Sequence, residues 1–301
     1  MTARVVCAGI AVLDRVYEMG AMPAAPGKYI AHDFRETGGG MAATAAVAIA
    51  ALGGTAAWCG RLGADPAGRT LLDAFARHGV DTSHVTVAPD GHTPTSAVIV
   101  EPEGERMLAC FTGAGLPEDA AIDPGLLAGA GSVLGDPRWL SGSERLFMLA
   151  AERGLKRVLD ADANATGILR RLAPLADHVV FSQRGLAEFA GTDDAEAGLA
   201  RVAPDLPGIT AVTLGPAGSL WWEQGRITHV PAPRVAARDT TGCGDVFHGA
   251  YALALAEGAA VPDAARFATA AAAIKAARGD GWDGMPDRTA VMDLLSEAWT
   301  A

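Results

Sequence analysis

The residues best suited to chemistry lie in one stretch, RDTTGCGDVFHGAY, which runs from Arg238 to Tyr251. Glycines and two hydroxyl residues stand directly before an apolar run spaced by three and four, so we expect a helix to begin near Gly242. The first turn of a helix leaves backbone N–H groups unpaired and carries partial positive charge, so it can bind an anion. Asp245 would stand beside that anion, where a carboxylate can take a proton from an attacking hydroxyl. A plain helix capped by Asp239 and Thr240 fits the same spacing.

Asp14 is a second candidate. It follows an apolar run, Val5 to Val12, that is expected to form a parallel strand buried on both faces. Ligands of open α/β sheets bind beyond the carboxyl ends of strands, so Asp14 either holds substrate hydroxyls or is a solvated loop acid. Gly38-Gly39-Gly40 then opens a helix-like run, Met41 to Leu52. These glycines either bring backbone amides close to a ligand or allow close packing.

Two polar loops follow later strands. Thr213 to Gly218 is rich in glycine and either holds a nucleotide phosphate or forms a hairpin turn. Asp160, Asp162 and Asn164 either contact substrate or a metal-bound water, or lie in a solvated loop. His248 lies one helical turn after Asp245, and we interpret it as an ordinary surface or core histidine.

The elements that must position these residues alternate between strands and helices. Strands are expected at 56–60, 132–134, 157–160, 178–181 and 210–214, and helices near 71–78, 143–153, 166–173, 185–190, 194–202, 243–257, 263–277 and 288–298. This alternation predicts an α/β fold in which helices cover both faces of a mostly parallel sheet. An antiparallel pair, 220–222 and 227–230, is expected to turn at Gln224-Gly225.

Two further segments are expected to form a small sheet that covers a pocket. One is a hairpin with strands Thr95–Val100 and Arg106–Phe111 and a turn at Pro102-Glu103-Gly104. The other, Met19 to Thr37, is polar and punctuated by proline and glycine, so it reads as an excursion from the core.

Composition limits the partners of the protein. The 301 residues are 50% hydrophobic, which is ample for a large core, and the net charge is −11. Without a basic excess, neither nucleic acid nor an anionic membrane is expected as a partner. The charge-free run 37–60 is broken at Gly53-Gly54, so it predicts a buried helix and a strand rather than a membrane span.

Several other activities lack their motifs. The four cysteines, Cys7, Cys59, Cys110 and Cys243, form no C-x-x-C pair and predict reduced thiols in a cytoplasmic protein. The sequence contains no P-loop and no G-x-S-x-G elbow, and no G-x-G-x-x-G follows the first strand. The seven histidines show no metal-binding spacing.

Four motifs together carry a resemblance. With GGGMAATAAVAIAALGG, GRLGADPAG, TLGPAGS and DTTGCGD, the chain resembles the ribokinase-like, PfkB-type carbohydrate kinases over nearly its full length. The resemblance implies one kinase domain, residues 1–301, with a three-layer α/β/α fold, a mostly parallel central sheet, and a β-sheet lid formed by about 13–37 and 90–115. It implies transfer of phosphate from ATP, with Mg²⁺, to a sugar hydroxyl, and a homodimer through the lid.

The resemblance also implies roles for single residues. Asp245 becomes the general base, and the amides of Gly242, Cys243 and Gly244 become the hole for the transferred phosphoryl group. The other matched positions are Asp14, Gly39 and Gly40 for sugar, Ser182, Thr213, Gly215, Gly218 and Lys275 for ATP, and Asp239 and Thr241 for a monovalent cation such as K⁺ in some members.

Two positions depart from the family pattern. Thr44 stands where the family usually has Asn, which puts ribose-type recognition in doubt. Ser182-Gln183-Arg184-Gly185 stands where it has N-x-x-E, a motif tied to Mg²⁺ and phosphate.

Both departures are shared with one subgroup, the 6-deoxy-6-sulfofructose kinases, which phosphorylate the 1-hydroxyl of a ketose. The segments PGKYIAHDF, DPRW and DHVVFSQRGLAEFAG resemble theirs. This resemblance places sulfonate-binding cations at Lys28 and Arg138, but Cys110 stands where an Asn is expected. The alternatives are a kinase for fructose, a 6-phosphorylated ketohexose, ribose or a nucleoside, or a non-catalytic sugar-binding regulatory protein.

Overall fold

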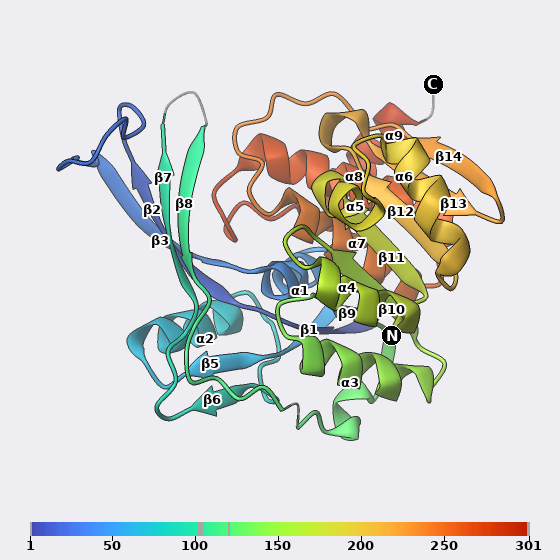
Figure 1. Ribbon diagram of the computed structural model, residues 1–301, viewed down its shortest axis with the longest axis horizontal. Coiled ribbons are helices and arrows are strands. Elements are labelled where there is room, and N and C mark those ends of the chain that lie inside the picture. Colours follow the sequence, from blue (N-terminus) through green and yellow to red (C-terminus); the bar gives the residue numbers. More distant parts are fainter. Residues whose placement is uncertain (1, 102–104, 120, 300–301) are drawn as a thin grey trace.

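The computed structural model describes residues 2–101, 105–119 and 121–299. Its main sheet has the strand order β14-β13-β12-β11-β10-β9-β1-β4 (Figure 1). The strands from β12 to β4 in this order run parallel, and β13 and β14 add an antiparallel edge. The bounds are β1 (Arg4–Ala8), β4 (Thr55–Cys59), β9 (Ala130–Gly135), β10 (Lys156–Ala161), β11 (His178–Ser182), β12 (Ile209–Thr213), β13 (Ser219–Glu223) and β14 (Arg226–Val230).

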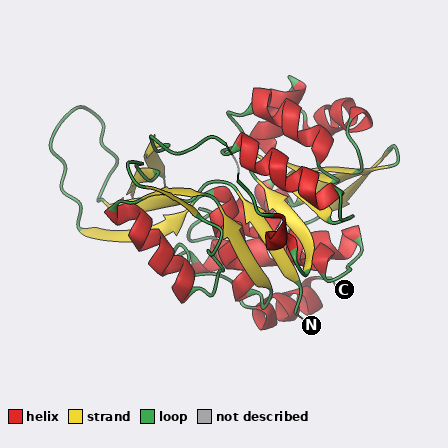
Figure 2. Cartoon of the chain, turned by 90° about the horizontal axis from the view of Figure 1, so that it is seen from below, coloured by secondary structure: helices red, strands yellow, loops and turns green. Residues whose placement is uncertain are grey.

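Helices cover both faces of this sheet, as Figure 2 shows. Side chains of a strand alternate between faces, so Val5 and Cys7 of β1 belong to one hydrophobic cluster, and Val6 and Ala8 belong to the other. The first cluster holds α1 (Met41–Ala51), α2 (Pro66–Arg77), α7 (Cys243–Ala256), α8 (Val261–Arg278) and α9 (Arg288–Ala298), and the second holds α3 (Leu140–Ala151), α4 (Thr166–Leu172), α5 (Gln183–Ala190) and α6 (Ala195–Val202). The predicted three-layer arrangement is confirmed.

A second sheet stands beside the core, to the left in Figure 1, and we call it the lid sheet. Its order is β3-β2-β7-β8, formed by β2 (Val12–Glu18), β3 (Asp33–Gly39), β7 (Thr95–Val100) and β8 (Arg106–Phe111). The predicted hairpin is present as β7 and β8, and its expected turn at 102–104 lies outside the described residues. A short parallel pair, β5 (Arg61–Gly63) and β6 (Thr86–Ala88), was not predicted.

The first strand prediction needs a correction. The apolar run from Val5 to Val12 is not one strand, because β1 ends at Ala8 and Val12 already begins β2 of the lid sheet. The chain leaves the core at Gly9, where a Cβ would lie 2.0 Å from Oδ2 of Asp136. The same Oδ2 accepts a hydrogen bond from the Ile10 amide at 2.9 Å. Asp14 therefore lies within a lid strand and not in a loop after a core strand.

The run 37–60 forms the end of β3, then α1 and β4, as predicted. In the part of the chain that the structure describes, no helix is both long and apolar enough to cross a membrane.

Candidate active site

A cavity of about 90 Å³ lies between the lid sheet and the core. It brings together residues that are far apart in the sequence, from β2, β3, α1, α7 and α8. The predicted site residues in its lining are Asp14, Gly39, Gly40, Thr44, Asp239, Thr241, Gly242, Asp245 and Lys275. The two carboxylates proposed for the sugar and for proton transfer, Asp14 and Asp245, thus face one cavity.

The start of α7 forms one wall of this cavity. Gly242 adopts the left-handed conformation (φ 72°), which favours glycine, and α7 begins at the next residue. Val246 N–H closes the first helical turn on Gly242 O at 2.9 Å, and Gly244 has open space where a Cβ would be. The Cys243 amide also donates to Thr240 O, at 3.3 Å. An anion can therefore approach this turn, most freely at Gly244.

The capped-helix alternative for this stretch is wrong. No side chain caps α7. Asp239 instead accepts hydrogen bonds from the amide and hydroxyl of Thr241, at 2.8 and 2.6 Å, within the loop that precedes the helix.

Asp245 lies in the first turn of α7 in a strongly acidic surrounding. Burial raises the pKa of Asp245 well above its usual range, and the nearby charge of Asp160 raises it further, while His248 acts in the opposite direction. A carboxylate with a raised pKa accepts a proton more readily at neutral pH, as a general base must.

His248 and Asp160 lie beneath this turn, and both are buried. His248 Nδ1 lies 2.7 Å from Gly244 O and 3.3 Å from Asp160 Oδ2, and Nε2 lies 3.1 Å from Val180 O. His248 is thus a core histidine, but it also links the anion-binding turn to β11. The solvated-loop alternative fails for Asp160, which is 2% exposed.

Two residues not expected from the sequence, Ser96 and Trp282, contact the side chains on the sugar side of the cavity. Ser96 of β7 donates a hydrogen bond to Asp14 Oδ1, and burial raises the pKa of Asp14. Trp282 Nε1 donates to the hydroxyl of Thr44 at 3.0 Å, and the indole also lines the cavity. Neither residue is near its partner in the sequence, and neither lies in a motif, so no local signal marks them.

The three glycines before α1 serve close packing. A Cβ would lie 2.4 Å from the Trp282 ring at Gly38, 2.1 Å from the Asp14 carboxylate at Gly39, and 2.6 Å from Ile10 O at Gly40. One amide of the first turn of α1 already has a partner, since Ala42 N–H donates to Asp136 Oδ2 at 3.0 Å. These contacts support the packing alternative, and Gly39 leaves room for the Asp14 side chain; since Gly39 and Gly40 also line the cavity, their role in sugar binding stays a prediction.

The residues expected to bind nucleotide lie at the carboxyl ends of β11 and β12, except Lys275. Ser182 accepts from Gly185 N–H at 2.9 Å and donates to Asp162 Oδ1 at 2.8 Å. Thr213 donates to Phe181 O at 3.4 Å.

The two glycines of the expected ATP loop have different surroundings. Gly215 has open space around it, whereas a Cβ at Gly218 would lie 2.1 Å from Val230 O. Gly215 thus leaves room for a ligand, and Gly218 is needed by the hairpin itself.

The altered N-x-x-E region has no room for a side chain at its last position. A Cβ at Gly185, where the family has Glu, would lie 2.4 Å from Ala161 O. The end of β10 thus packs directly on the first turn of α5. This packing places the Asp162 carboxylate beside Ser182.

The three residues expected to select the substrate lie outside the lining of this cavity. Lys28 is exposed in the loop between β2 and β3. Arg138 donates to Ala163 O at 2.9 Å and pairs with Asp162 at 3.4 Å. Cys110 is exposed on β8, but it pairs with Ser96, which pairs with Asp14, so these three residues form one row across the lid sheet.

Asp239 and Thr241, expected to hold a monovalent cation, are already occupied by the chain. Besides its bonds from Thr241, Asp239 Oδ1 accepts from Nη1 of Arg106 at 2.9 Å. Lys275 is buried nearby. Because Arg106 already pairs with this carboxylate and a second basic side chain, Lys275, is buried nearby, the residues present do not fit an added cation.

Comparison with known proteins identifies the family of the chain. The model of the pfkB family of carbohydrate kinases matches residues 2–288. The chain belongs to this family. Like the family, it is a sugar kinase, a phosphotransferase with an alcohol group as acceptor.

Individual pfkB relatives cover most of the chain. A ribokinase from Haemophilus influenzae is 29% identical over 86% of this chain and 88% of its own length. A fructokinase from Klebsiella pneumoniae is 32% identical over 69% and 74%. Among solved structures, Arabidopsis thaliana ribokinase complexed with ribose and ATP has a TM-score of 0.87 at 26% identity, covering 98% of this chain and 99% of that one.

Proposed function

We propose that this kinase transfers the γ-phosphate of ATP to the 1-hydroxyl of a ketohexose, with 6-deoxy-6-sulfofructose as the leading substrate. The observation that carries the proposal is the single cavity in which Asp14 and Asp245 face the start of α7. Asp14 would hold sugar hydroxyls, and Asp245 would take the proton of the attacking hydroxyl. The amides of the first turn of α7 would stabilise the transferred phosphoryl group, because they point toward developing negative charge.

ATP and Mg²⁺ are the proposed cofactors. The ribose- and ATP-bound relative supports ATP, which would lie along Ser182, Thr213 and Gly215. Mg²⁺ usually keeps several waters and binds through one or two carboxylates together with phosphate oxygens. Asp162 suits this role, because it lies at the carboxyl end of β10 and its side chain is 40% exposed. When bound, the ion would neutralise phosphate charge.

The sulfonate assignment rests on Lys28 and Arg138, which match the sulfonate-binding positions of the 6-deoxy-6-sulfofructose kinases. An arginine and a lysine together suit a sulfonate, since guanidinium gives directional hydrogen bonds and ammonium gives a point charge. One observation favours a neutral sugar such as fructose instead. Nη2 of Arg138 already pairs with Asp162, and a neutral sugar would leave this ion pair undisturbed.

We further propose that the chain works as one kinase domain and pairs through its lid sheet. One row of this sheet contains Phe34, Tyr17, Ile99 and Met107. It lies on the face opposite Asp14, and Phe34 and Met107 are about half exposed. The four cysteines are free, which supports a cytoplasmic location.

A substrate panel tests the proposed function. ADP release would be measured with sulfofructose, fructose, fructose 6-phosphate, ribose and a nucleoside at equal concentrations. The proposal expects the largest kcat/KM for sulfofructose. The largest value for a neutral ketohexose would favour the second candidate, and the largest value for ribose or a nucleoside would contradict both.

A further inference from the structure

We propose that Lys275 and Arg106 take the place of a bound monovalent cation beside the anion-binding turn, so that the protein neither binds nor needs K⁺. The expected effect on turnover rests on the proposed function. Its effect on ion binding can be measured without any substrate.

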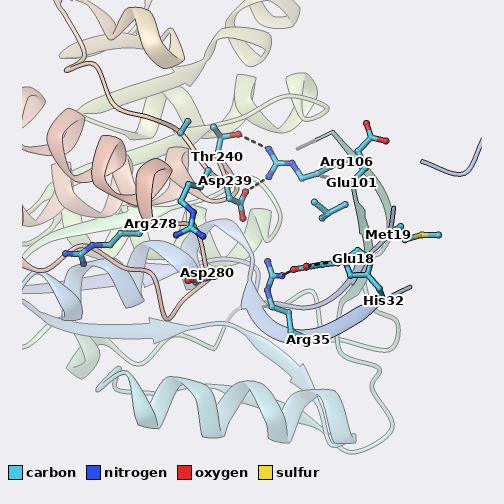
Figure 3. Close-up of a pocket in the computed structure, with 14 residues that line it drawn as sticks. Glu18, Met19, His32, Arg35, Glu101, Arg106, Asp239, Thr240, Arg278 and Asp280 are labelled. Carbon is cyan, nitrogen blue, oxygen red and sulfur yellow. Dashed lines mark hydrogen bonds and ion pairs between the residues drawn. The ribbon is translucent and has the colours of Figure 1, made fainter. Parts of the chain in front are cut away.

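The first observation is the set of donors around Asp239. Its Oδ1 accepts three hydrogen bonds, from Thr241 N and Oγ1 and from Arg106 Nη1. A second guanidinium nitrogen, Nη2 of Arg106, donates to the hydroxyl of Thr240 at 2.8 Å (Figure 3). A guanidinium is planar and forked, so it can hold two neighbouring oxygens at once. Arg106 thus fills the place where a cation would meet Asp239 and the hydroxyls beside it.

The second observation is the position of Lys275. It lies in the last turn of α8 and is 1% exposed, and its Nζ donates to Gly279 O at 2.9 Å. The end of a helix leaves carbonyl groups unpaired and carries partial negative charge, so it attracts a cation. Gly279 also lies against Asp239, since a Cβ built on it would be 3.3 Å from Asp239 Cβ. The ammonium therefore satisfies a helix end next to the same carboxylate.

Both cations act on the acid that they surround. Burial raises the pKa of Asp239, but hydrogen bonds from Thr241 and the charges of Arg106 and Lys275 lower it, so the pKa lies below its usual range. Burial lowers the pKa of Lys275, and Cys243, Asp239 and Asp280 oppose that shift. The chain itself therefore places a guanidinium on Asp239 and an ammonium on the neighbouring Gly279 carbonyl.

The two cations come from different parts of the molecule. Lys275 belongs to the core, and Arg106 begins β8 of the lid sheet. The loop 238–239 is anchored to the end of α8 by hydrogen bonds from both of its amides to Ala276 O, at 2.8 and 3.2 Å. This loop leads directly into the first turn of α7, so the two cations fix the approach to that turn. They are positioning residues and need not touch the substrate.

A cavity of about 580 Å³ reaches this place from solvent, lined by Arg35, Arg106, Asp239, Thr240 and Gly279 among others (Figure 3). If the Lys275 side chain is removed, a small cation can enter here and meet Asp239 and Gly279 O. The structure therefore predicts that K⁺ or NH₄⁺ rescues Lys275→Ala. Neither ion is expected to affect the natural protein.

The experiment compares the natural protein, Lys275→Ala and Lys275→Met with the control Lys156→Ala, which changes an exposed lysine at the opposite end of the sheet. ADP release would be measured with magnesium salts and either K⁺ or tetramethylammonium as the only monovalent cation. We expect the natural protein and Lys156→Ala to be indifferent to the exchange. Lys275→Ala should lose about tenfold or more in kcat without K⁺, a loss expected when a site that stabilises charge is disordered, and should regain much of it with K⁺ or NH₄⁺.

A second readout uses no substrate. An ion that binds only the folded state raises the melting temperature, so K⁺ should raise Tm over tetramethylammonium for Lys275→Ala and not for the natural protein. A K⁺-specific rise in Tm or in kcat of the natural protein would overturn the inference, as would full activity of Lys275→Met without K⁺. If no sugar is phosphorylated, the proposed function fails, and the Tm comparison still decides the inference. If Lys275→Ala does not fold, the natural protein and Lys275→Met decide it.

Discussion

Nδ1 of His248 lies 3.3 Å from Oδ2 of Asp160, and both side chains are buried beneath the turn that carries Asp245. Both nitrogens of His248 face oxygen atoms, since Gly244 O and Val180 O are its other partners. Burial lowers the pKa of His248, whereas the contacts with the two carbonyl groups act to raise it, because they favour N–H groups on both ring nitrogens. Burial is the main cause of the raised pKa of Asp245, and these two buried neighbours act on it in opposite directions, Asp160 raising it and His248 lowering it.

Asp245→Asn is expected to lower kcat by roughly 10²–10⁴-fold, which is the usual effect of removing a positioned base. The raised pKa of Asp245 means that its charged form opposes folding at every pH above the carboxyl's unfolded value. The substitution should therefore raise Tm at neutral pH, and the gain should shrink as the pH falls toward about 4. Asp263→Asn, in the exposed first turn of α8, is the control: kcat should not change, and loss of the exposed ion pair with Arg266 should lower Tm slightly rather than raise it. Near-normal kcat for Asp245→Asn would remove the base assignment.

The pH profile of kcat/KM should have an acid limb set by Asp245. Because the pKa of this carboxyl is raised, activity is expected to fall at a higher pH than for an ordinary aspartate. His248→Gln should move the limb to still higher pH, because His248 lowers the pKa of Asp245. A lower kcat with an unmoved limb would indicate that His248 only supports the structure.

Lys28→Ala and Arg138→Ala test the anion pocket. If both cations bind a sulfonate, each substitution should raise KM for sulfofructose by about tenfold or more and leave KM for fructose nearly unchanged, because a charged hydrogen bond contributes about 1.5–3 kcal/mol. The kinetics of both variants with both sugars give the answer. Equal changes for the two sugars would contradict the pocket.

Gly185→Ala should destabilise the protein, because the added Cβ would lie 2.4 Å from Ala161 O. Such overpacking costs about 1–3 kcal/mol. Gly167 lies in the first turn of α4 with open space around it, so Gly167→Ala is the matched control and should stabilise by roughly 0.5–1 kcal/mol. Denaturant unfolding measures both. Equal stability of the two variants would contradict the steric account of the lost motif.

Met107→Glu tests pairing through the lid sheet. The side chain is 47% exposed on the face opposite Asp14, so a charge there should not disturb the core. Sedimentation should find the natural protein as a dimer and the variant as a monomer at the same concentration. A monomeric natural protein would remove the proposed dimer.

The sequence predicted the order of core elements well, because strands buried on both faces and amphipathic helices leave strong local patterns. It also singled out Asp245, Gly242 and Asp14, which the structure brings to one cavity, although Asp14 lies in a lid strand and not in the loop that was expected. The contacts that complete the site could not be predicted in this way. Ser96 meets Asp14 through pairing of two strands that are 82 residues apart, and Trp282 reaches Thr44 across 238 residues. His248 was noted in the sequence as an ordinary histidine. Its contact with Asp160, which belongs to β10, could not be predicted from the local pattern.

The carboxylate of Asp136 ties together the point at which the chain passes from the core to the lid sheet, since it accepts from the amides of Ile10, Ala42 and Arg138. Asp14 is four residues past Ile10, whereas Lys28 is in the loop beyond the far end of β2. If the lid sheet rotates about this anchor, Asp14 is displaced less than Lys28, because displacement grows with distance from the pivot. The sugar contact that must meet Asp245 would then be the one that lid rotation disturbs least.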